Sequence, residues 1–283
     1  MKSVVITGAE GKLGRYVVRE FAEHGYRIIG SDMRTPGSNA VYDQFMQMNL
    51  NEQDEVNRLL EKADYVVHLA AVPNPISFSE EYIFSNNVVS TYHILQAASN
   101  LGIPRAVIGS SESAYGFCWA KTPFSPNYFP VDEKHPLLPQ EGYGLSKGVN
   151  EQTGDMFFRR SGIGVYSLRF SNVLEPKDYD WLKREFGNTG RFHRILWSYI
   201  DARDAAIACR MCIEDTKPAQ SIALNITSSD MMSDKSPEQL ANIHYSEVID
   251  IRSPLSELTA LVSNELAYET IGWRPRHSWR DTL

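Results

Sequence analysis

The sequence has little cysteine and no long apolar run. It holds three cysteines among 283 residues, and an odd number in a chain of this length cannot form a disulfide framework and suits a reducing compartment. The longest apolar stretches, such as residues 65–72, have the length of a strand and fall far short of the roughly 20 residues that cross a bilayer. We therefore expect no membrane span and no membrane partner.

An excess of positive charge is also missing. The chain carries 28 Lys and Arg against 35 Asp and Glu, a net charge of −7, and no window gathers basic residues into a stripe that could follow a phosphate backbone. Nucleic acid is therefore not an expected partner. Lys2 is followed within a few residues by the turn-forming Gly8, which leaves too little room for the apolar core of a signal peptide. The chain start is expected to be a first strand, and the protein to be cytoplasmic.

The composition is that of a folded globular protein. Hydrophobic residues make up 42% and charged residues 22%, which excludes disorder, collagen and coiled coil as descriptions of the whole chain. The length fits one large domain, or one domain and a small appendage, and is enough for a sizeable core.

Cys209 and Cys212 form a C-x-x-C motif. A structural zinc site needs a second pair of ligands, and none follows. The segment 204–214 has a helical pattern that puts both thiols on one face. We expect thiols packed in the core, and no metal site.

The first 110 residues alternate between strand-like and helix-like patterns. Strands are predicted at residues 4–7, 27–30, 45–50, 65–70 and 105–110, and helices at residues 12–24, 53–61 and 83–100. Such alternation indicates parallel strands joined by right-handed crossovers, with helices on both faces of the sheet. The predicted fold class is therefore α/β with a doubly wound parallel sheet.

The pattern breaks between residues 117 and 140, where five prolines stand. No helix or strand is expected at that density, so we predict an ordered loop or lid. Periodicity then resumes, with helices predicted at residues 143–160 and 202–213 and strands at residues 164–170 and 222–226. The residues after about 171 are expected to form a small cap on the larger sheet.

A G-x-x-G-x-x-G motif directly follows the first predicted strand and opens the first helix. Gly8 would permit a sharp turn, Gly11 the close approach of a pyrophosphate, and Gly14 tight packing of the helix on the strand. A simple glycine-rich turn is the alternative. The strand before the motif and the helix after it favour dinucleotide binding.

Asp32 ends the second predicted strand, 18 residues past Gly14. A carboxylate at this place accepts both hydroxyls of a ribose and repels a 2′-phosphate, which favours NAD over NADP. Arg34, two residues further on, would partly offset that repulsion.

Tyr143 and Lys147 form a Y-x-x-x-K motif at the start of a predicted helix, with both side chains on one face. A phenol is a poor base at neutral pH, but a neighbouring ammonium and an oxidised nicotinamide would both favour the phenolate, making Tyr143 a general acid/base. Ser110 and Ser111 stand at the carboxyl end of a predicted strand, where a serine can bind a substrate oxygen.

With these motifs in order, the chain resembles the extended short-chain dehydrogenases/reductases, the NAD-dependent epimerase/dehydratase family. Further segments resemble landmarks of that family: HLAA at 68–71, NVVST at 87–91, LRFSNV at 168–173, YIDARD at 199–204, LNI at 224–226 and GWRP at 272–275. Ser90 departs from the glycine usual in the second of these. The resemblance covers essentially the whole chain.

The resemblance implies a Rossmann domain over residues 1–170 that binds NAD and carries the catalytic Ser111, Tyr143 and Lys147. Residues 171–283 would form the small substrate-binding cap, interleaved with the last strands of the sheet. The implied cofactor-binding residues are Gly8, Gly11, Lys12, Leu13, Gly14, Asp32, Met33, Asn49, Leu50, Leu69, Ala70, Ala71, Asn87, Ser110, Tyr143, Lys147 and Phe170. Asn49 stands where an aspartate is usual. The implied substrate-binding residues are Val72, Ser111, Glu112, Ser113, Tyr143, Asn172 and Arg194. Helices 83–100 and 143–160 resemble the pair through which the family forms homodimers.

The short C-terminal part favours a small substrate within the family. Residues 175–283 must supply the last strands, which leaves little room for a nucleoside diphosphate. Segments 175–179 and 194–199 resemble those of uronate dehydrogenases, in which an arginine at the place of Arg194 holds the substrate carboxylate.

This chain departs from the uronate dehydrogenases by an insertion at residues 180–193, and by Glu112 and Ser113 after the catalytic serine. Glu112 would repel a carboxylate if it faced the pocket. A surface position is the alternative for Arg194. For Trp181 and Trp197, core packing is favoured over stacking on a sugar.

The predicted function is an oxidoreductase of carbohydrate metabolism that transfers hydride between a hydroxyl of a sugar or sugar acid and NAD. One alternative is a sugar or nucleotide-sugar epimerase or dehydratase that retains its NAD. The other is a non-catalytic NAD-binding regulator, against which the intact Ser111, Tyr143 and Lys147 argue.

Overall fold

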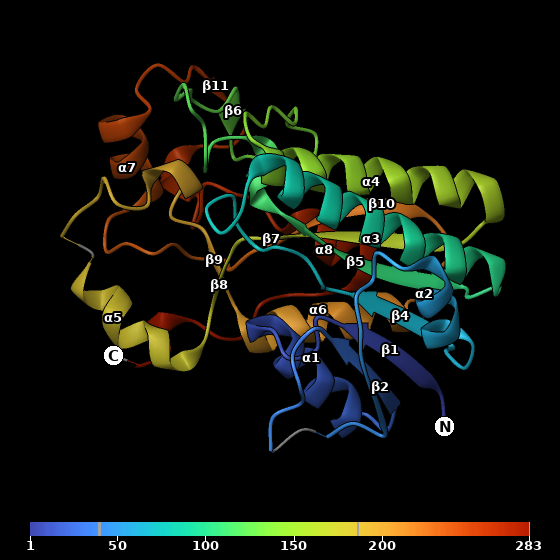
Figure 1. The fold of residues 1–283 in the computed structure, drawn as a ribbon. Coiled ribbons are helices and arrows are strands. Elements are labelled where there is room, and N and C mark those ends of the chain that lie inside the picture. The colour runs from blue at the N-terminus through green and yellow to red at the C-terminus, as the bar shows by residue number, and fades with distance from the viewer. Residues whose placement is uncertain (39–40, 186, 283) are drawn as a thin grey trace.

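A computed structural model describes residues 1–38, 41–185 and 187–282 of the chain. Its centre is a parallel sheet of seven strands in the order β3-β2-β1-β4-β5-β7-β10 (Figure 1). The strands are β1 (Ser3–Thr7), β2 (Arg27–Asp32), β3 (Gln44–Gln47), β4 (Tyr65–His68), β5 (Arg105–Ser111), β7 (Gly164–Phe170) and β10 (Ser221–Ile226). The chain builds outward from β1 in one direction and then from β4 in the other, so the order reverses between these two strands. The predicted doubly wound fold is confirmed.

Helices cover both faces of this sheet (Figure 1). On one face lie α1 (Lys12–Glu23) and α6 (Ala202–Glu214), and on the other α2 (Gln53–Leu60), α3 (Glu80–Asn100) and α4 (Gly142–Ser161). A further helix, α8 (Glu265–Ile271), packs beside β10. No helix in the described ranges is both long and apolar enough to span a membrane.

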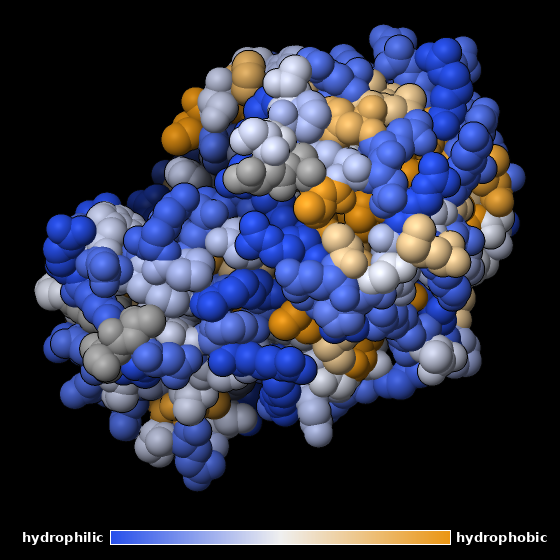
Figure 2. Space-filling view, turned by 90° about the horizontal axis from the view of Figure 1, so that it is seen from below, coloured by the Kyte–Doolittle hydropathy of each residue, from blue (hydrophilic) through white to orange (hydrophobic). Residues whose placement is uncertain are grey.

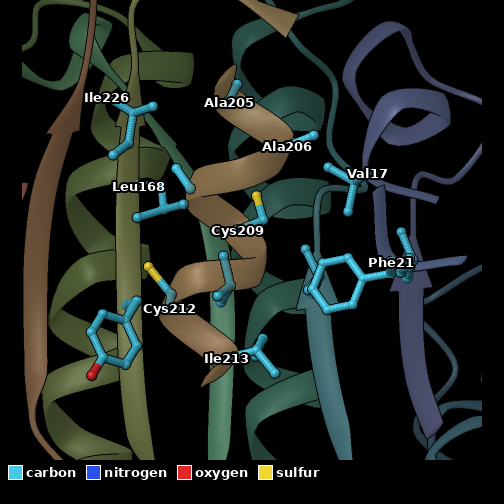
Figure 3. Close-up of a cluster of buried hydrophobic side chains, with 14 of the residues drawn as sticks. Val17, Phe21, Leu168, Ala205, Ala206, Cys209, Cys212, Ile213 and Ile226 are labelled. Atoms are coloured by element: carbon cyan, nitrogen blue, oxygen red, sulfur yellow. The ribbon is translucent and has the colours of Figure 1, made fainter. Parts of the chain in front are cut away.

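The face that carries α1 and α6 encloses a hydrophobic cluster (Figure 3). Val17 and Phe21 of α1 lie at a spacing of four, so both point toward the sheet. Cys209 and Cys212 of α6 are buried in the same cluster, as expected for core thiols. Burial raises the pKa of both thiols, which keeps them neutral and unreactive. The outer surface seen from below is mostly hydrophilic, with small separate apolar patches (Figure 2).

A second hydrophobic cluster lies outside the sheet and organises the cap. It draws Tyr115, Phe117 and Phe129 from the middle of the chain and Trp197 and Trp279 from its end. The short elements around it are η1 (Glu112–Tyr115), β6 (Tyr128–Phe129), β8 (Asn172–Leu174), η2 (Pro176–Asp178), α5 (Tyr179–Arg184), η3 (His193–Ile195), β9 (Tyr199–Asp201), α7 (Pro237–His244), β11 (Asp250–Ile251), η4 (Leu255–Glu257) and η5 (Trp279–Thr282). The cap therefore also takes residues from before position 171. Within the expected insertion and cap, Phe186 and Leu283 lie outside the described residues.

The proline-rich segment is ordered, as expected, but it is not free of strand. The two residues of β6 pair in parallel with β11, and Val131 forms a bridge to Val262. Pro126 and Pro130 flank β6 and remove no hydrogen-bond donor from its ladder. The segment is therefore a fixed wall of the cap.

One strand of the sheet is shorter than its apolar pattern predicted. A strand was expected over residues 45–50, whereas β3 ends at Gln47. Its neighbour β2 ends at Asp32. The last hydrogen bond between the two strands therefore runs from the Met48 amide to the Asp32 carbonyl, and residues after Met48 have no strand to pair with. The chain turns there, and Met48, Asn49 and Leu50 reach the edge of a cavity.

A buried ion pair joins the sheet to α4. Both carboxylate oxygens of Glu151 accept from the guanidinium of Arg169 on β7, at 2.9 and 2.7 Å, and Arg169 is 5% exposed. We predict that Glu151→Ala lowers the free energy of unfolding by about 3–5 kcal/mol, because it leaves this buried guanidinium without a carboxylate, with only the Tyr115 hydroxyl and the Glu133 carbonyl as acceptors. Urea unfolding followed by circular dichroism measures the change. As a matched control, Glu55→Ala breaks an exposed pair with Arg58 and should cost no more than about 1 kcal/mol. Equal costs for both variants would contradict a structural role of the buried pair.

Candidate active site

A cavity of about 1280 Å³ opens at the carboxyl ends of the parallel strands. Pockets for a single ligand measure roughly 300–1,000 Å³, so this one has room for a cofactor and a second molecule. Every residue predicted from the sequence to contact cofactor or substrate lines it, with the exception of Asn87. The reversal of strand order between β1 and β4 is the usual place for such a cavity in an open α/β sheet.

At two positions of the glycine motif a side chain would collide with the neighbouring backbone, so only glycine is tolerated, as in a dinucleotide-binding turn. Gly8 has a φ of 66°, and a Cβ on it would lie 2.7 Å from the Ala70 amide nitrogen. A Cβ on Gly14 would lie 2.0 Å from the Gly8 carbonyl oxygen. Gly11 precedes α1, supplies no side-chain cap, and no acidic residue follows in the first turn. The amides of that turn are therefore left for the anion that a helix N-terminus binds, as a pyrophosphate requires.

Lys12 links this motif to the cap. Its Nζ donates to the Val173 carbonyl oxygen at 3.2 Å and lies 3.7 Å from a carboxylate oxygen of Asp178. The contact ties the first turn of α1 to the segment that follows β8. The cavity near the glycine motif is thus bounded by residues from both halves of the sequence.

Asp32 lies at the cavity edge, as the spacing predicted, but its carboxylate is already engaged. It accepts from the Glu10 amide at 3.0 Å and from the Arg34 amide at 3.0 Å. The Arg34 guanidinium also folds back on it, with Nε at 3.3 Å. The charge that favours NAD is therefore partly neutralised by the neighbouring Arg34 guanidinium.

Asn87, predicted from the sequence to contact the cofactor, is not among the residues that line the cavity. It is 1% exposed, its Oδ1 accepts from the Val72 amide at 2.8 Å, and its Nδ2 donates to the Val72 carbonyl at 3.1 Å. Nδ2 also lies 3.3 Å from the Ser146 hydroxyl on α4. Both ends of the side chain are occupied, so Asn87 holds the cavity wall at Val72.

Ser111, Tyr143 and Lys147 come together as the motif predicted. Ser111 ends β5, and Tyr143 and Lys147 stand in the first turns of α4, whose amides are capped by Glu141 at 2.6 and 2.7 Å. The Lys147 Nζ donates to the Gly109 carbonyl at 2.6 Å and lies 5.5 Å from the centre of the Tyr143 ring. Three groups able to hold and move a proton thus meet in the cavity.

Burial controls the ionisation of this group. It raises the pKa of Tyr143 to about 12, against the lowering effect of the hydrogen bond with the Ser111 hydroxyl. It lowers the pKa of Lys147 to about 8, opposed by the charge of Glu151. The expected lowering of the phenol pKa is therefore not supplied by the chain's own residues.

Glu112, Ser113, Asn172 and Arg194, which the sequence predicted to bind substrate, also line the cavity. Arg194 stands on η3, is exposed, and donates to the Ala120 carbonyl at 3.3 Å. Glu112 lines the cavity. The sequence predicted that an ionised Glu112 in this position would repel a substrate carboxylate. Burial raises its pKa to about 8, so near neutral pH the group is mostly uncharged and the expected repulsion is removed.

Two segments contribute residues that the sequence did not reveal. Cys118 and Trp119 come from the proline-rich segment, and residues 191–193 from the insertion. Neither segment has periodicity, and the insertion has no counterpart in the family pattern. The two tryptophans weighed for sugar stacking differ in exposure. Trp197 is 1% exposed and packs in the second cluster, whereas Trp181 is 37% exposed.

Comparison with known proteins decides the family. The model of the NAD dependent epimerase/dehydratase family matches residues 4–227. The chain belongs to this family. NAD is therefore its cofactor, and the glycine cradle and Asp32 fit it.

Relatives within the family differ in activity. A putative UDP-glucose 4-epimerase of Methanocaldococcus jannaschii is 32% identical over 60% of this chain and 55% of its own length. The L-arabinose 1-dehydrogenase (NAD(P)(+)) of Haloferax volcanii is 26% identical over 81% of this chain and 89% of its own. A uronate dehydrogenase of Pseudomonas syringae is 29% identical over 62% of this chain and 61% of its own length. The chain thus spans little more than half of the first of these relatives.

Solved structures agree on the fold. A short-chain dehydrogenase/reductase superfamily protein from Agrobacterium tumefaciens with bound NAD superposes with a TM-score of 0.75 at 20% identity, covering 99% of this chain and 94% of that one. A mutated uronate dehydrogenase superposes with a TM-score of 0.71 at 18% identity, covering 100% of this chain and 85% of that one.

We predict that Tyr143→Phe lowers turnover by ~10²–10⁴, the loss expected for a general acid/base, while NAD affinity stays nearly unchanged. The substitution keeps the buried ring and removes only the hydroxyl. Lys147→Met should weaken both turnover and NAD binding, because the family places this ammonium against the cofactor ribose. Steady-state kinetics and fluorescence titration with NAD measure the two effects, and near-normal turnover of Tyr143→Phe would refute the assignment.

We predict that Asp32→Ser weakens NAD binding by about 10- to 150-fold, equivalent to the roughly 1.5–3 kcal/mol of a charged hydrogen bond. It also releases Arg34, so the preference should move toward NADP. The matched variant Arg34→Ala keeps the carboxylate, removes its guanidinium partner and should sharpen the preference for NAD. A wild-type protein that binds NADP more tightly than NAD would show that Arg34 dominates.

Proposed function

We propose that this protein is an NAD-dependent dehydrogenase that acts on a hydroxyl of a sugar or sugar acid. The observation that carries the proposal is the meeting of Ser111, Tyr143 and Lys147 beside the glycine cradle, in one cavity. A binding module without turnover has no need of all three groups.

Each of the three residues has a distinct role. Ser111 and Tyr143 hold the reacting hydroxyl, and the Tyr143 oxygen takes its proton. Lys147 stabilises the phenolate and binds the cofactor ribose. The cofactor, when bound, accepts the hydride, and the positive charge of its oxidised ring favours the phenolate that burial alone disfavours.

Arg194 supports a small substrate at the other end of the cavity. A planar guanidinium suits bidentate binding of a carboxylate, and the neutral state of Glu112 removes a competing negative charge. The relatives that are uronate and arabinose dehydrogenases act in the same family on sugars of this size.

An epimerase that retains its NAD is the second candidate. Arg191, His193 and Arg194 all line the cavity, and three such groups would suit a diphosphate. The relatives include UDP-glucose 4-epimerases.

A panel of sugars, sugar acids and nucleotide sugars, each incubated with excess NAD, separates the candidates. Accumulation of NADH in solution, followed by absorbance, supports the dehydrogenase. Conversion of a nucleotide sugar without net NADH supports the epimerase. No turnover of any member would support a regulator.

We further propose a homodimer formed through α3 and α4. These helices lie side by side on one face of the sheet (Figure 1), and Tyr82, Tyr92 and Leu145 are more than two-fifths exposed on them, at 45%, 41% and 47%. The cytoplasmic location stays a prediction from the sequence.

We predict that Arg194→Lys raises KM for an acidic sugar by about 10- to 100-fold and for its neutral counterpart by much less, because a lysine cannot form the bidentate pair. NAD binding should stay unchanged. Arg191→Lys is the matched control, since Arg191 is already paired with Glu185 at 2.7 Å, and it should change KM less than about threefold. Equal effects of Arg194→Lys on both sugars would leave Arg194 with a structural role through Ala120.

A further inference from the structure

Glu112 joins the catalytic strand to the turn that carries Arg194. It follows Ser111 directly, as the first residue of η1, and lines the main cavity. It also lines, together with Arg194 and Ile195, a small cavity of about 10 Å³ behind the main one. The side chain therefore lies where the end of β5 meets η3.

The contacts of Ser198 bear on the protonation state of Glu112. The Ser198 Oγ lies 2.5 Å from Oε2 of Glu112 and 2.6 Å from the carbonyl oxygen of Ile195. A hydroxyl has one proton to donate, and both a carbonyl oxygen and a carboxylate oxygen only accept. Two full hydrogen bonds form when Glu112 carries a proton and donates it to Ser198, which then donates to Ile195; an ionised Glu112 would share the single Ser198 proton with Ile195.

The surroundings of Glu112 favour the same state. The side chain is partly buried in the cavity wall. Its carboxyl has hydrogen bonds to the Ser171 hydroxyl and the Asn172 amide, and desolvation outweighs these bonds in raising its pKa. The ionisable groups that face it from neighbouring elements are Cys118 after η1 and Tyr143 on α4. Arg194 on η3 shares both cavities with it.

The turn that Ser198 belongs to is strained and needs outside support. Leu196 and Trp197 both have a φ of 53°, the left-handed region that bulky residues rarely adopt. Such a conformation persists only where the surroundings impose it. The Trp197 carbonyl accepts from the Met232 amide at 2.8 Å on one side of the turn. The bond from Glu112 to Ser198 supports the other side.

We propose that Glu112 is a positioning residue which, as a neutral carboxylic acid, holds the turn 195–198 against the end of β5 and thereby places Arg194 at the substrate end of the cavity. Loss of the proton reverses the bond, so that Ser198 donates to the carboxylate and no longer to the Ile195 carbonyl inside the turn, and it puts a negative charge beside Ser111. Substrate affinity, above all for an acidic sugar, therefore falls as Glu112 ionises. The part played by Arg194 rests on the proposed function, whereas the protonated state of Glu112 does not.

The kinetic test compares Glu112→Gln with the wild-type protein across pH. A carboxamide donates to Ser198 and does not ionise. We expect the wild-type KM for an acidic sugar to rise by up to about tenfold per pH unit above pH ~8, and this rise to be absent from Glu112→Gln. Lys147, whose pKa is also near 8, is unchanged in both proteins, so the difference between the two profiles reports Glu112. The same alkaline rise in both proteins would overturn the proposal.

Two further variants separate positioning from packing. Glu112→Ala and Ser198→Ala each remove one end of the bond, so each should raise KM at neutral pH by about 2- to 10-fold, the range of one hydrogen bond. The double variant should cost no more than either one, since both remove the same interaction. Additive effects would contradict a shared bond.

A stability measurement tests the protonated state without any substrate. The folded pKa of Glu112 is raised from an ordinary 4.5 to about 8, so the folded state holds a proton that the unfolded state has lost between these values. The stabilising effect is then complete below pH 4.5 and is lost as the pH rises to about 8. The difference in Tm between the wild-type protein and Glu112→Gln should fall across this range and level off above it.

The KM profile and the Tm profile test different parts of the proposal, so each can contradict it independently. If no sugar is oxidised, the proposed function is wrong, and the Tm profile still decides the state of Glu112. A Tm difference that does not change with pH would show an ionised Glu112 and overturn the inference. A sloping Tm difference together with a KM profile that Glu112→Gln leaves unaltered would refute the positioning role.

Discussion

All seven strands of the central sheet run in the same direction, and the site depends on this constraint. Because the carboxyl ends of parallel strands meet at one edge, Gly8 after β1, Asp32 on β2, and Ser111 on β5 face a common cavity although they are far apart in the sequence. Right-handed crossovers bring the helices back to start at the same edge. Both the cradle at α1 and the Tyr143 turn of α4 follow from that geometry.

Two buried charged residues of opposite sign lie one turn apart on α4, and neighbouring groups compensate for them. Lys147 is 5% exposed and rests on the Gly109 carbonyl. One turn further along, Glu151 accepts from the Ser110 hydroxyl at 2.6 Å and from Arg169 of the adjacent strand. The helix therefore carries the Lys147 ammonium and the Glu151 carboxylate on one face. This arrangement places the reactive groups and at the same time locks α4 onto β5 and β7.

Local pattern was enough to predict the strands and main helices of the central sheet, and all the residues it placed at the site except Asn87 line one cavity. Periodicity marks α1 and β4, and the glycine motif is informative because it lies between a strand and a helix. Contacts between residues far apart in the sequence could not be predicted from local pattern. Asn87 lies in a recognisable motif, yet its amide is taken up by Val72, a contact set only when α3 packs on the sheet. The neutral state of Glu112 depends on Ser198, which is 86 positions away. The two residues of β6 find their partner in β11, more than a hundred positions along the chain.

The division of apolar residues into separate clusters bears on how such proteins diversify. Tyr115, Phe129 and Trp197 pack with one another outside the sheet and share no member with the cluster that fixes α1 and its glycine cradle. Substitutions in this outer cluster alter the shape of the substrate end, while the cradle keeps its packing. Changes at distant, independent sites act additively, so selection can explore new substrates through the cap and retain the inherited cofactor site.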